Sequence, residues 1–296
     1  MLLYRLRGTS HRRRLQSKIK KNFRDCLKTT LSGYCPLLRI RPAVRLACFG
    51  LPFRKALIRA AELGAKAVEI DARHELPLGE MSQTAIRQIR KLLDDQGLRI
   101  SALSFNTRRG YNVMADLDRR VEATRQAMLL ASNLGCNVVT NRIGVVPEDQ
   151  EDSSFTALQQ ILVDLGEYGQ RVGALLAART GSEDGEVLAA MLATLPAGYG
   201  AVDLDPGSLV MNGYSATEST QSLAPYVVHM RIRDGLRDIA RGQGAAAAFG
   251  AGAVDFDQLF AMLEEQHYAG YFTVDPASSR NVVGEVATAL QRLQSI

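Results

Sequence analysis

Apolar residues follow two alternating patterns from about residue 44 to the C-terminus. Short, nearly continuous apolar runs are separated by longer segments in which apolar residues recur every three or four positions. The short runs are typical of strands buried on both faces of a parallel sheet. Eight such strands are predicted, at Val44–Cys48, Lys66–Asp71, Arg99–Ser104, Asn137–Thr140, Gly173–Ala178, Gly200–Leu204, Tyr226–Ile232 and Tyr271–Val274.

The longer segments between these runs predict amphipathic helices, because a spacing of three to four residues places apolar side chains on one helix face. Gly64, Gly97 and Gly135 each lie between such a segment and the next strand, where glycine can end a helix in the left-handed conformation without a Cβ clash. The predicted helices include Ser82–Gln96 and Phe155–Val172 and the segments around Leu117–Ala131 and Phe256–Leu263.

The order of these elements predicts the fold class. Eight strands with helices between them over about 250 residues indicate a (β/α)8 TIM barrel over residues 44–296. A doubly wound open sheet is the alternative. Its nucleotide-binding versions lose support, because neither G-x-G-x-x-G nor G-x-x-x-x-G-K-[ST] follows the first strand.

The net charge of +5 combines two unlike parts. Residues 1–45 contain 13 Lys and Arg residues and one acidic residue, Asp25, whereas the remainder of the chain carries a charge of −7. We therefore predict a basic N-terminal arm over residues 1–43, unstructured or loosely packed, attached to a mildly acidic barrel. Contact with a nucleic acid or an anionic surface is expected only through this arm.

Other features of the chain concern its location. It contains no apolar stretch of 18 residues and no secretory signal pattern, so we expect no transmembrane segment. The four cysteines lack CxxC spacing, which favours reduced thiols and a cytoplasmic protein. The sequence is compatible with a homo-oligomer but does not predict the oligomeric state.

Candidate chemistry lies where strands end, because TIM barrels carry their active sites at the carboxyl ends of the strands. Carboxylates that converge there suggest either a bound hard cation or acid–base catalysis on a polyol. Arginines there suggest an anionic ligand, or ion pairs with the carboxylates. The residues at these positions are Glu69, Asp71, Ser104, Asn141, Arg142, Arg179, Asp205, Arg231, Arg233, Asp234 and Asp275.

Two loop segments add further candidates. Arg108 and Arg109 follow the third strand and could clamp a phosphate, although a solvated loop is the simpler interpretation. The small residues of 242–248 predict either a mobile lid or an inert connector.

Four segments carry motifs of a known superfamily. Phe53–Asp71 joins a helix to a strand with Glu69 near its end, and Ala201–Gly213 holds a strand that ends in an acid. Val227–Gly235 is similar to a strand ending in His-x-Lys-Asp, and Phe249–Asp275 runs from Gly-x-Gly through Val-Asp-Phe and Tyr-x-Gly into the last strand. In this order the motifs resemble the xylose isomerase-like TIM barrel superfamily, which includes sugar and sugar-phosphate isomerases and epimerases and endonuclease IV.

The resemblance implies a divalent metal (Mn, Zn or Mg) held by Glu, Asp, His and Glu on strands 5 to 8. The corresponding residues here are Arg179, Asp205, Arg231 and Asp275. Asp205 and Asp275 are therefore the candidate catalytic residues and metal ligands. A guanidinium cannot ligate a cation, so we expect the usual metal site to be damaged or lost. A shifted alignment would make His229 a ligand; a core histidine is the alternative.

Substrate contacts are also implied by the resemblance or by position. The candidate substrate-binding residues are Glu69, Asn141, Arg179, Arg231 and Arg237. The ligand expected from the superfamily is a small sugar or sugar phosphate.

Three functions remain open. The resemblance implies a sugar or sugar-phosphate isomerase or epimerase, which transfers a proton next to a sugar carbonyl, here with a degenerate metal site. The alternative is a non-catalytic barrel that binds an anionic sugar or acid. Endonuclease IV-like DNA repair is the weakest, because that branch needs a three-metal cluster rich in histidine and this chain has four histidines.

Overall fold

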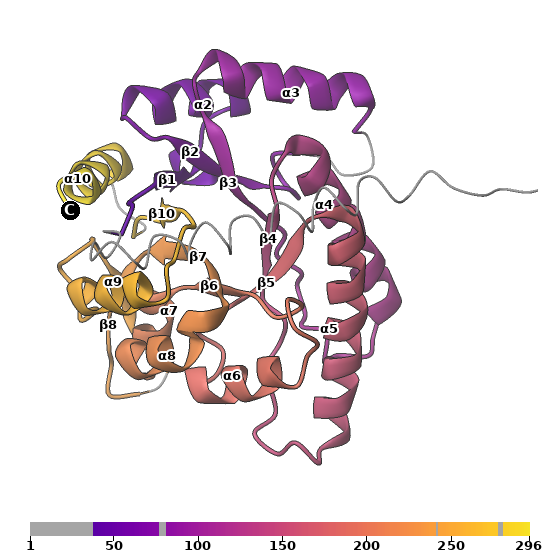
Figure 1. Ribbon diagram of the computed structural model, residues 1–296. Coiled ribbons are helices and arrows are strands. Elements are labelled where there is room, and N and C mark those ends of the chain that lie inside the picture. The colour runs from indigo at the N-terminus through magenta and orange to yellow at the C-terminus, as the bar shows by residue number, and fades with distance from the viewer. Residues whose placement is uncertain (1–37, 77–80, 241, 278–280) are drawn as a thin grey trace, which may run out of the picture. The chain divides into compact units, whose positions relative to one another are not determined.

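A computed structural model of the chain describes residues 38–76, 81–240, 242–277 and 281–296. Eight parallel strands close into a barrel in the order β1-β10-β7-β6-β5-β4-β3-β2 (Figure 1). The fold is thus the predicted (β/α)8 TIM barrel. The barrel strands are β1 (Pro42–Arg45), β2 (Ala67–Asp71), β3 (Arg99–Ser104), β4 (Val138–Asn141), β5 (Leu175–Arg179), β6 (Val202–Leu204), β7 (Val227–Ile232) and β10 (Phe272–Val274).

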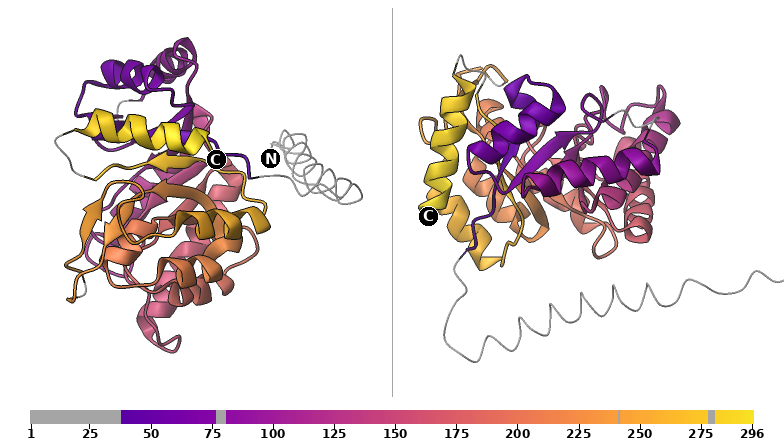
Figure 2. Two further views of the ribbon diagram at one scale, coloured as in Figure 1. Left: turned by 90° about the vertical axis from the view of Figure 1, so that its left-hand side faces the viewer. Right: turned by 90° about the horizontal axis from the view of Figure 1, so that it is seen from above.

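Helices surround the barrel and bury one face against the strands (Figures 1 and 2). In α5, for example, the buried residues include Phe155, Leu158, Leu162 and Leu165, which is the predicted stripe. The helices are α2 (Phe53–Glu62), α3 (Gln83–Asp95), α4 (Leu117–Leu134), α5 (Ser153–Val172), α6 (Gly185–Ala193), α7 (Pro206–Met211), α8 (Ala216–Leu223), α9 (Phe256–Glu265) and α10 (Val282–Gln294), with short 3-10 turns η1 (Leu46–Phe49) and η3 (Ala224–Tyr226).

The first strand differs from its prediction. We expected Val44–Cys48, but β1 begins at Pro42 and residues 46–49 form η1. Proline is tolerated at the first position of a strand because its missing N–H need not join the ladder. Gly50 then ends η1 with a φ of 60°, in the left-handed region. The apolar run continues through both elements, so its pattern could not show where the strand stops.

A second difference concerns the small residues expected to form a lid or connector. Ala245–Ala247 form strand β9, which pairs antiparallel with β8 (Asp234–Leu236). The segment therefore contains a short strand that the sequence did not predict. By comparison, Gly64, Gly97 and Gly135 all have positive φ, which confirms their predicted left-handed conformation at helix ends.

The interior of the barrel holds both apolar and charged side chains. Small apolar residues such as Ala102, Val138, Ala177 and Ala201 form one cluster. Buried polar residues of the strands include Glu69, Ser101, Thr140, Asp203, His229, Arg231 and Thr273. The barrel centre is therefore polar, and a buried polar group requires partners.

Candidate functional site

Arg231 lies at the centre of the barrel interior. It extends from β7, is 1% exposed, and contacts side chains from four other strands or strand ends. Its Nε donates to Asp203 Oδ2 at 3.0 Å, its Nη1 to Asp275 Oδ2 at 3.2 Å, and its Nη2 to Glu69 Oε2 at 2.5 Å. A longer contact of 3.4 Å joins Nη2 to Thr140 Oγ1. One guanidinium thus neutralises carboxylates from three directions.

Asp203 is a second centre of the same network, and the strand register places it there. On β6 it is paired with Arg179 of β5 on one side and with His229 of β7 on the other. Arg179 Nε donates to Asp203 Oδ2 at 2.8 Å, and His229 Nδ1 lies 2.7 Å from Oδ1. Burial would raise the pKa of Asp203, but Arg231, Arg179 and His229 outweigh burial and lower it. Asp203 is therefore a permanently charged, very weak base.

His229 is hydrogen-bonded at both ring nitrogens. Besides Asp203 at Nδ1, its Nε2 lies 2.7 Å from Thr273 Oγ1, and Thr273 contacts Ser101 Oγ at 3.1 Å. The residue is completely buried. Neither ring nitrogen is left for a cation, so the arrangement is that of a hydrogen-bonded core histidine.

The two aspartates predicted as metal ligands are engaged by the protein itself. Both oxygens of Asp205 accept hydrogen bonds from Ser208, at 2.8 Å from the backbone N and 2.8 Å from the hydroxyl, so Asp205 caps α7. Asp275 accepts from Arg45 on one oxygen and from Arg231 on the other, each at 3.2 Å. Burial alone would raise the pKa of Asp275, but the positive charges of Arg231 and Arg45 have the larger effect, so this pKa is lowered.

A divalent metal therefore does not fit these residues. Arg179 and Arg231 stand at two of the four implied ligand positions, and their guanidiniums occupy the space between the carboxylates as cations. No group of three or more His, Cys, Asp or Glu residues able to hold a metal occurs in the described ranges. The positive charge that a metal would supply is already supplied by arginine.

Glu69 differs from the other carboxylates of the network. Its Oε2 contacts Arg231, but its Oε1 is buried and has no hydrogen-bond partner among the described residues. The side chain is 1% exposed. A buried carboxylate oxygen without a donor is costly, so this atom is an acceptor available to another group.

Arg142 and Arg233 follow β4 and β7 and are less tightly paired than Arg179 and Arg231. Arg142 follows β4 and makes no hydrogen bond or ion pair within the described part of the chain. The pKa of Arg142 is lowered, mainly because its guanidinium is partly buried and further because Arg179 repels its charge. Arg233 lies 3.6 Å from Asp205 and 3.9 Å from Asp275, both long contacts, and its Nε is buried with no hydrogen-bond partner among the residues that the structure describes.

Two predicted substrate contacts have other partners. The Asn141 side chain is buried, accepts from Thr107 N at 3.1 Å and donates to the Tyr111 hydroxyl at 2.8 Å, so it holds the loop after β3. Arg237 is exposed and donates to the backbone oxygen of Tyr214 at 3.1 Å. The structure brings neither residue into contact with the Arg231 network.

Sequence reasoning missed Asp203, Arg45 and Thr140. Asp203 lies two residues before Asp205, and residues two apart on a strand face the same side. That spacing was the available signal. Arg45 was placed inside the first predicted strand, and Thr140 gave no signal because a threonine in a strand is ordinary.

Two further carboxyl groups near strand ends have strongly raised pKa values. Burial raises the pKa of Glu183 to about 7, against one hydrogen bond of 3.4 Å from Val146 N. Burial also raises the pKa of Glu75 to about 7, and the nearby Asp71 and Glu69 add to this effect. A carboxyl group that titrates near neutral pH can exchange protons under physiological conditions.

Replacing Glu183 with glutamine should remove a pH dependence of stability. In the folded chain the group stays protonated to about pH 7, whereas the unfolded chain ionises above about pH 4.3, so the wild type loses stability as pH rises between these values. At pH 8 we expect Glu183→Gln to be more stable by about 3 kcal/mol, with little difference below pH 4.5. Urea denaturation at several pH values measures the free energy of unfolding. The control is Glu167→Gln, at an exposed position of α5. Parallel pH curves for wild type and Glu183→Gln would contradict it.

Comparison with known proteins agrees with this architecture. The sequence model of the family described as "Xylose isomerase-like TIM barrel" matches residues 57–296, and the chain belongs to this family. No significant match is found among curated proteins. None of the helices in the described ranges is long and apolar enough to cross a membrane.

Solved structures share the fold at low sequence identity. A xylose isomerase domain protein from Planctomyces limnophilus is 20% identical, with a TM-score of 0.74 over 81% of this chain and 91% of that one. A xylose isomerase-like TIM barrel protein from Mycobacterium smegmatis, in complex with magnesium, is 19% identical, with a TM-score of 0.68 over 82% and 87%. D-allulose 3-epimerase from Methylomonas sp., in complex with D-allulose, is 17% identical, with a TM-score of 0.68 over 87% and 97%. This chain therefore shares its fold with a sugar epimerase and with a barrel protein that was solved with magnesium.

Proposed function

We propose that this barrel binds a small anionic carbohydrate, a sugar acid or sugar phosphate, at the carboxyl ends of its strands without a divalent metal. The observation that carries the proposal is Arg231, buried among Asp203, Asp275 and Glu69 where the family places metal-binding chemistry. With the carboxylates paired internally, the guanidinium of Arg142 has no ion pair among the described residues, and Arg233 is held only by ion pairs of 3.6 and 3.9 Å, so the barrel end offers two loosely held cations to a ligand. Such cations favour an anion.

The same network disfavours metal-dependent isomerisation. Asp203 and Asp275 have lowered pKa values and accept hydrogen bonds from arginines, so they are weak proton acceptors at neutral pH. Arg179 and Arg231 themselves are saturated by Asp203, Glu69, Asp275, Thr140 and Asn106. A ligand would therefore contact Arg142 and Arg233 rather than the two arginines that the sequence suggested.

Two measurements test this proposal: the metal content of the protein, and its affinity for a charged compared with a neutral ligand. The purified full-length chain, incubated with Mn, Zn or Mg and then dialysed, should hold well under one equivalent by elemental analysis. In calorimetric titrations gluconate should bind, and neutral sorbitol, which has the same carbon skeleton, should not. Arg142→Ala and Arg233→Ala should each weaken gluconate binding about tenfold, because a charged hydrogen bond contributes about 1.5 kcal/mol or more.

A substitution far from the strand ends serves as the control. Arg54→Ala, on the exposed surface of α2, should leave gluconate affinity unchanged. One equivalent of tightly held metal, or equal binding of gluconate and sorbitol, would refute the proposal.

A metal-free isomerase or epimerase is the second candidate, favoured by the unpartnered Oε1 of Glu69. A carboxylate oxygen in this state can accept a proton from a substrate carbon or hydroxyl. In D2O, such an enzyme would place deuterium on the carbon next to a ketose carbonyl, which NMR detects. Glu69→Gln should abolish this exchange while anion binding persists. If gluconate binds but no ketose or ketose phosphate takes up deuterium, only the binding function is supported.

A further inference from the structure

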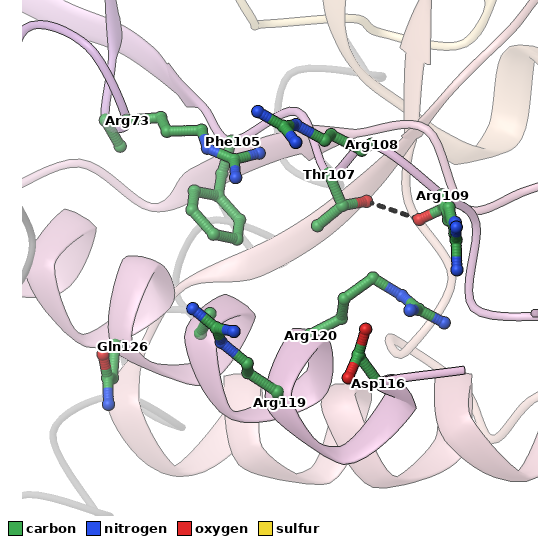
Figure 3. Close-up of a pocket in the computed structure, with 11 residues that line it drawn as sticks. Arg73, Phe105, Thr107, Arg108, Arg109, Asp116, Arg119, Arg120 and Gln126 are labelled. Carbon is green, nitrogen blue, oxygen red and sulfur yellow. Dashed lines mark hydrogen bonds between the residues drawn. The ribbon is translucent and has the colours of Figure 1, made fainter. Parts of the chain in front are cut away.

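A pocket of about 680 Å³ lies beside the loop after β3, outside the Arg231 network (Figure 3). Its wall is formed by residues after β2, by the segment from Phe105 to Arg109, and by the first turns of α4. Asp116 is the acidic member of the lining. The arginines that line it are Arg73, Arg108, Arg109, Arg119 and Arg120.

Two of these arginines are fixed by the backbone. Arg73 Nη1 donates to the backbone oxygen of Asn106 at 2.9 Å. Arg120 donates to the backbone oxygens of Gly110, Val113 and Ala115 and so holds the loop that precedes α4. Backbone carbonyls satisfy the donors of an arginine but do not cancel its charge, so both side chains still contribute a positive charge to the pocket.

The guanidiniums of the other three arginines have no partner within the described residues. Those of Arg108, Arg109 and Arg119 make neither an ion pair nor a hydrogen bond there, although the backbone oxygen of Arg109 accepts from Thr107 Oγ1 at 2.9 Å. Like charges gathered around one cavity repel each other, and Asp116 offsets a single charge. The pocket therefore has a net charge of about +4, which a ligand with several negative charges would neutralise.

The start of α4 adds to this potential. The helix has 18 residues, and its N-cap, Asp116, has a φ of 56° and makes no side-chain hydrogen bond to the first turn. The partial positive charge of the helix end is thus not capped by Asp116. Asp116, Arg119 and Arg120 all line the pocket, so this first turn faces it (Figure 3).

We propose that this arginine pocket binds a compound with two or more linked phosphate groups, either an inorganic polyphosphate or the polyphosphate moiety of a nucleotide. Three guanidiniums without a partner among the described residues exceed what a single phosphate can engage, and the volume suits a small molecule rather than one ion. The start of α4 contributes less, because Asp118 in its first turn offsets part of the charge of the helix end. The site is independent of the carbohydrate site proposed above. Asn106 nevertheless contacts both, since its backbone oxygen accepts from Arg73 and its side chain accepts from Arg179 at 3.1 Å.

Calorimetric titration of the full-length chain at 150 mM salt tests the proposal with tripolyphosphate, pyrophosphate and orthophosphate as probes. We expect tripolyphosphate to bind at least about tenfold more tightly than orthophosphate, because more charged hydrogen bonds form. The double variant Arg108→Ala/Arg119→Ala should lose about tenfold or more in tripolyphosphate affinity. Asp116→Asn should bind more tightly by a few fold, because it removes the opposing charge and asparagine tolerates positive φ.

The basic residues of 1–37 could also attract a polyanion, so the controls keep them intact. Arg54→Ala/Arg87→Ala removes the same charge from exposed positions of α2 and α3 and should change the affinity by less than about twofold. Arg108→Ala/Arg119→Ala should leave the affinity for gluconate unchanged, which separates this site from the carbohydrate site. An equal loss in Arg54→Ala/Arg87→Ala, or no loss in Arg108→Ala/Arg119→Ala, would overturn the proposal.

Discussion

Arg231→Met should destabilise the barrel by about 3–5 kcal/mol, which is the cost of breaking a buried ion pair from one side. The substitution leaves Asp203, Asp275 and Glu69 close together in the interior without their shared counter-charge. Methionine replaces much of the side-chain volume, so the loss reports charge more than packing. Urea denaturation at pH 7 measures it.

The pH dependence identifies the cause of this loss. In the wild type the pKa values of Asp203 and Asp275 are lowered, so their contribution to stability is present above the unfolded pKa near 3.9 and disappears as pH falls through the folded values. In Arg231→Met that contribution is reduced, because Arg179 still neighbours Asp203 and Arg45 still neighbours Asp275, but the largest favourable influence on both is lost. The difference between wild type and variant should therefore be largest at neutral pH and shrink toward pH 4, where the carboxylates left without Arg231 can take up protons.

A matched surface substitution serves as the control. Arg54→Met on α2 removes one exposed guanidinium and should change stability by less than about 0.5 kcal/mol. If Arg231→Met were as mild as Arg54→Met, or if its effect were the same at pH 4 and pH 7, the central role of this guanidinium would be wrong.

Asp234→Ala should be almost as harmful, although Asp234 contacts no residue of the Arg231 network. Its carboxylate accepts four backbone N–H groups: Gly235 and Val254 on Oδ1, at 2.8 and 3.1 Å, and Gly250 and Gly252 on Oδ2, at 3.0 and 2.8 Å. Removing it leaves four backbone donors without this acceptor, two of them in buried and two in part-buried hydrogen bonds, which we expect to cost about 3 kcal/mol. Thermal unfolding should shift down by about 6–12 °C.

A double-mutant cycle with Gly252 sharpens this prediction. A Cβ at Gly252 would lie 2.1 Å from Asp234 Oδ1, so Gly252→Ala forces the carboxylate away and should be destabilising in the wild type. In the Asp234→Ala background the same substitution should cost less, because the carboxylate clash is absent, but part of the cost should remain, because the Cβ would also lie 2.6 Å from the Gly235 backbone oxygen. Additive effects of the two substitutions would contradict the proposed contact. The close approach of the backbone to the Asp234 carboxylate accounts for glycine at position 252. Gly250 has a φ of 78°, and a Cβ there would meet the Arg292 guanidinium.

Much of the fold was accessible from the sequence. Periodicity alone predicted eight strands and the helices between them. Burial on both faces gives a strand such as β5 a nearly continuous apolar run, and a helix such as α5 shows its buried stripe at every turn. The end of β1 was not accessible, because the apolar pattern runs on into η1 and only backbone hydrogen bonds distinguish the two. The pairing of β9 with β8 was hidden for a similar reason: three alanines carry no periodic signal.

For the site, the sequence by itself determined which strand ends carry charge, and it showed that arginine replaces two of the four residues through which the family would hold a metal. Only the tertiary structure decided the partners. It joined Arg231 of β7 to Glu69, 162 positions away in the chain, and placed the unremarked Asp203 between Arg179 and His229. The physical reason is that residue type sets the charge of a group, whereas strand register and barrel closure decide which charges meet, and neither can be read from a single strand.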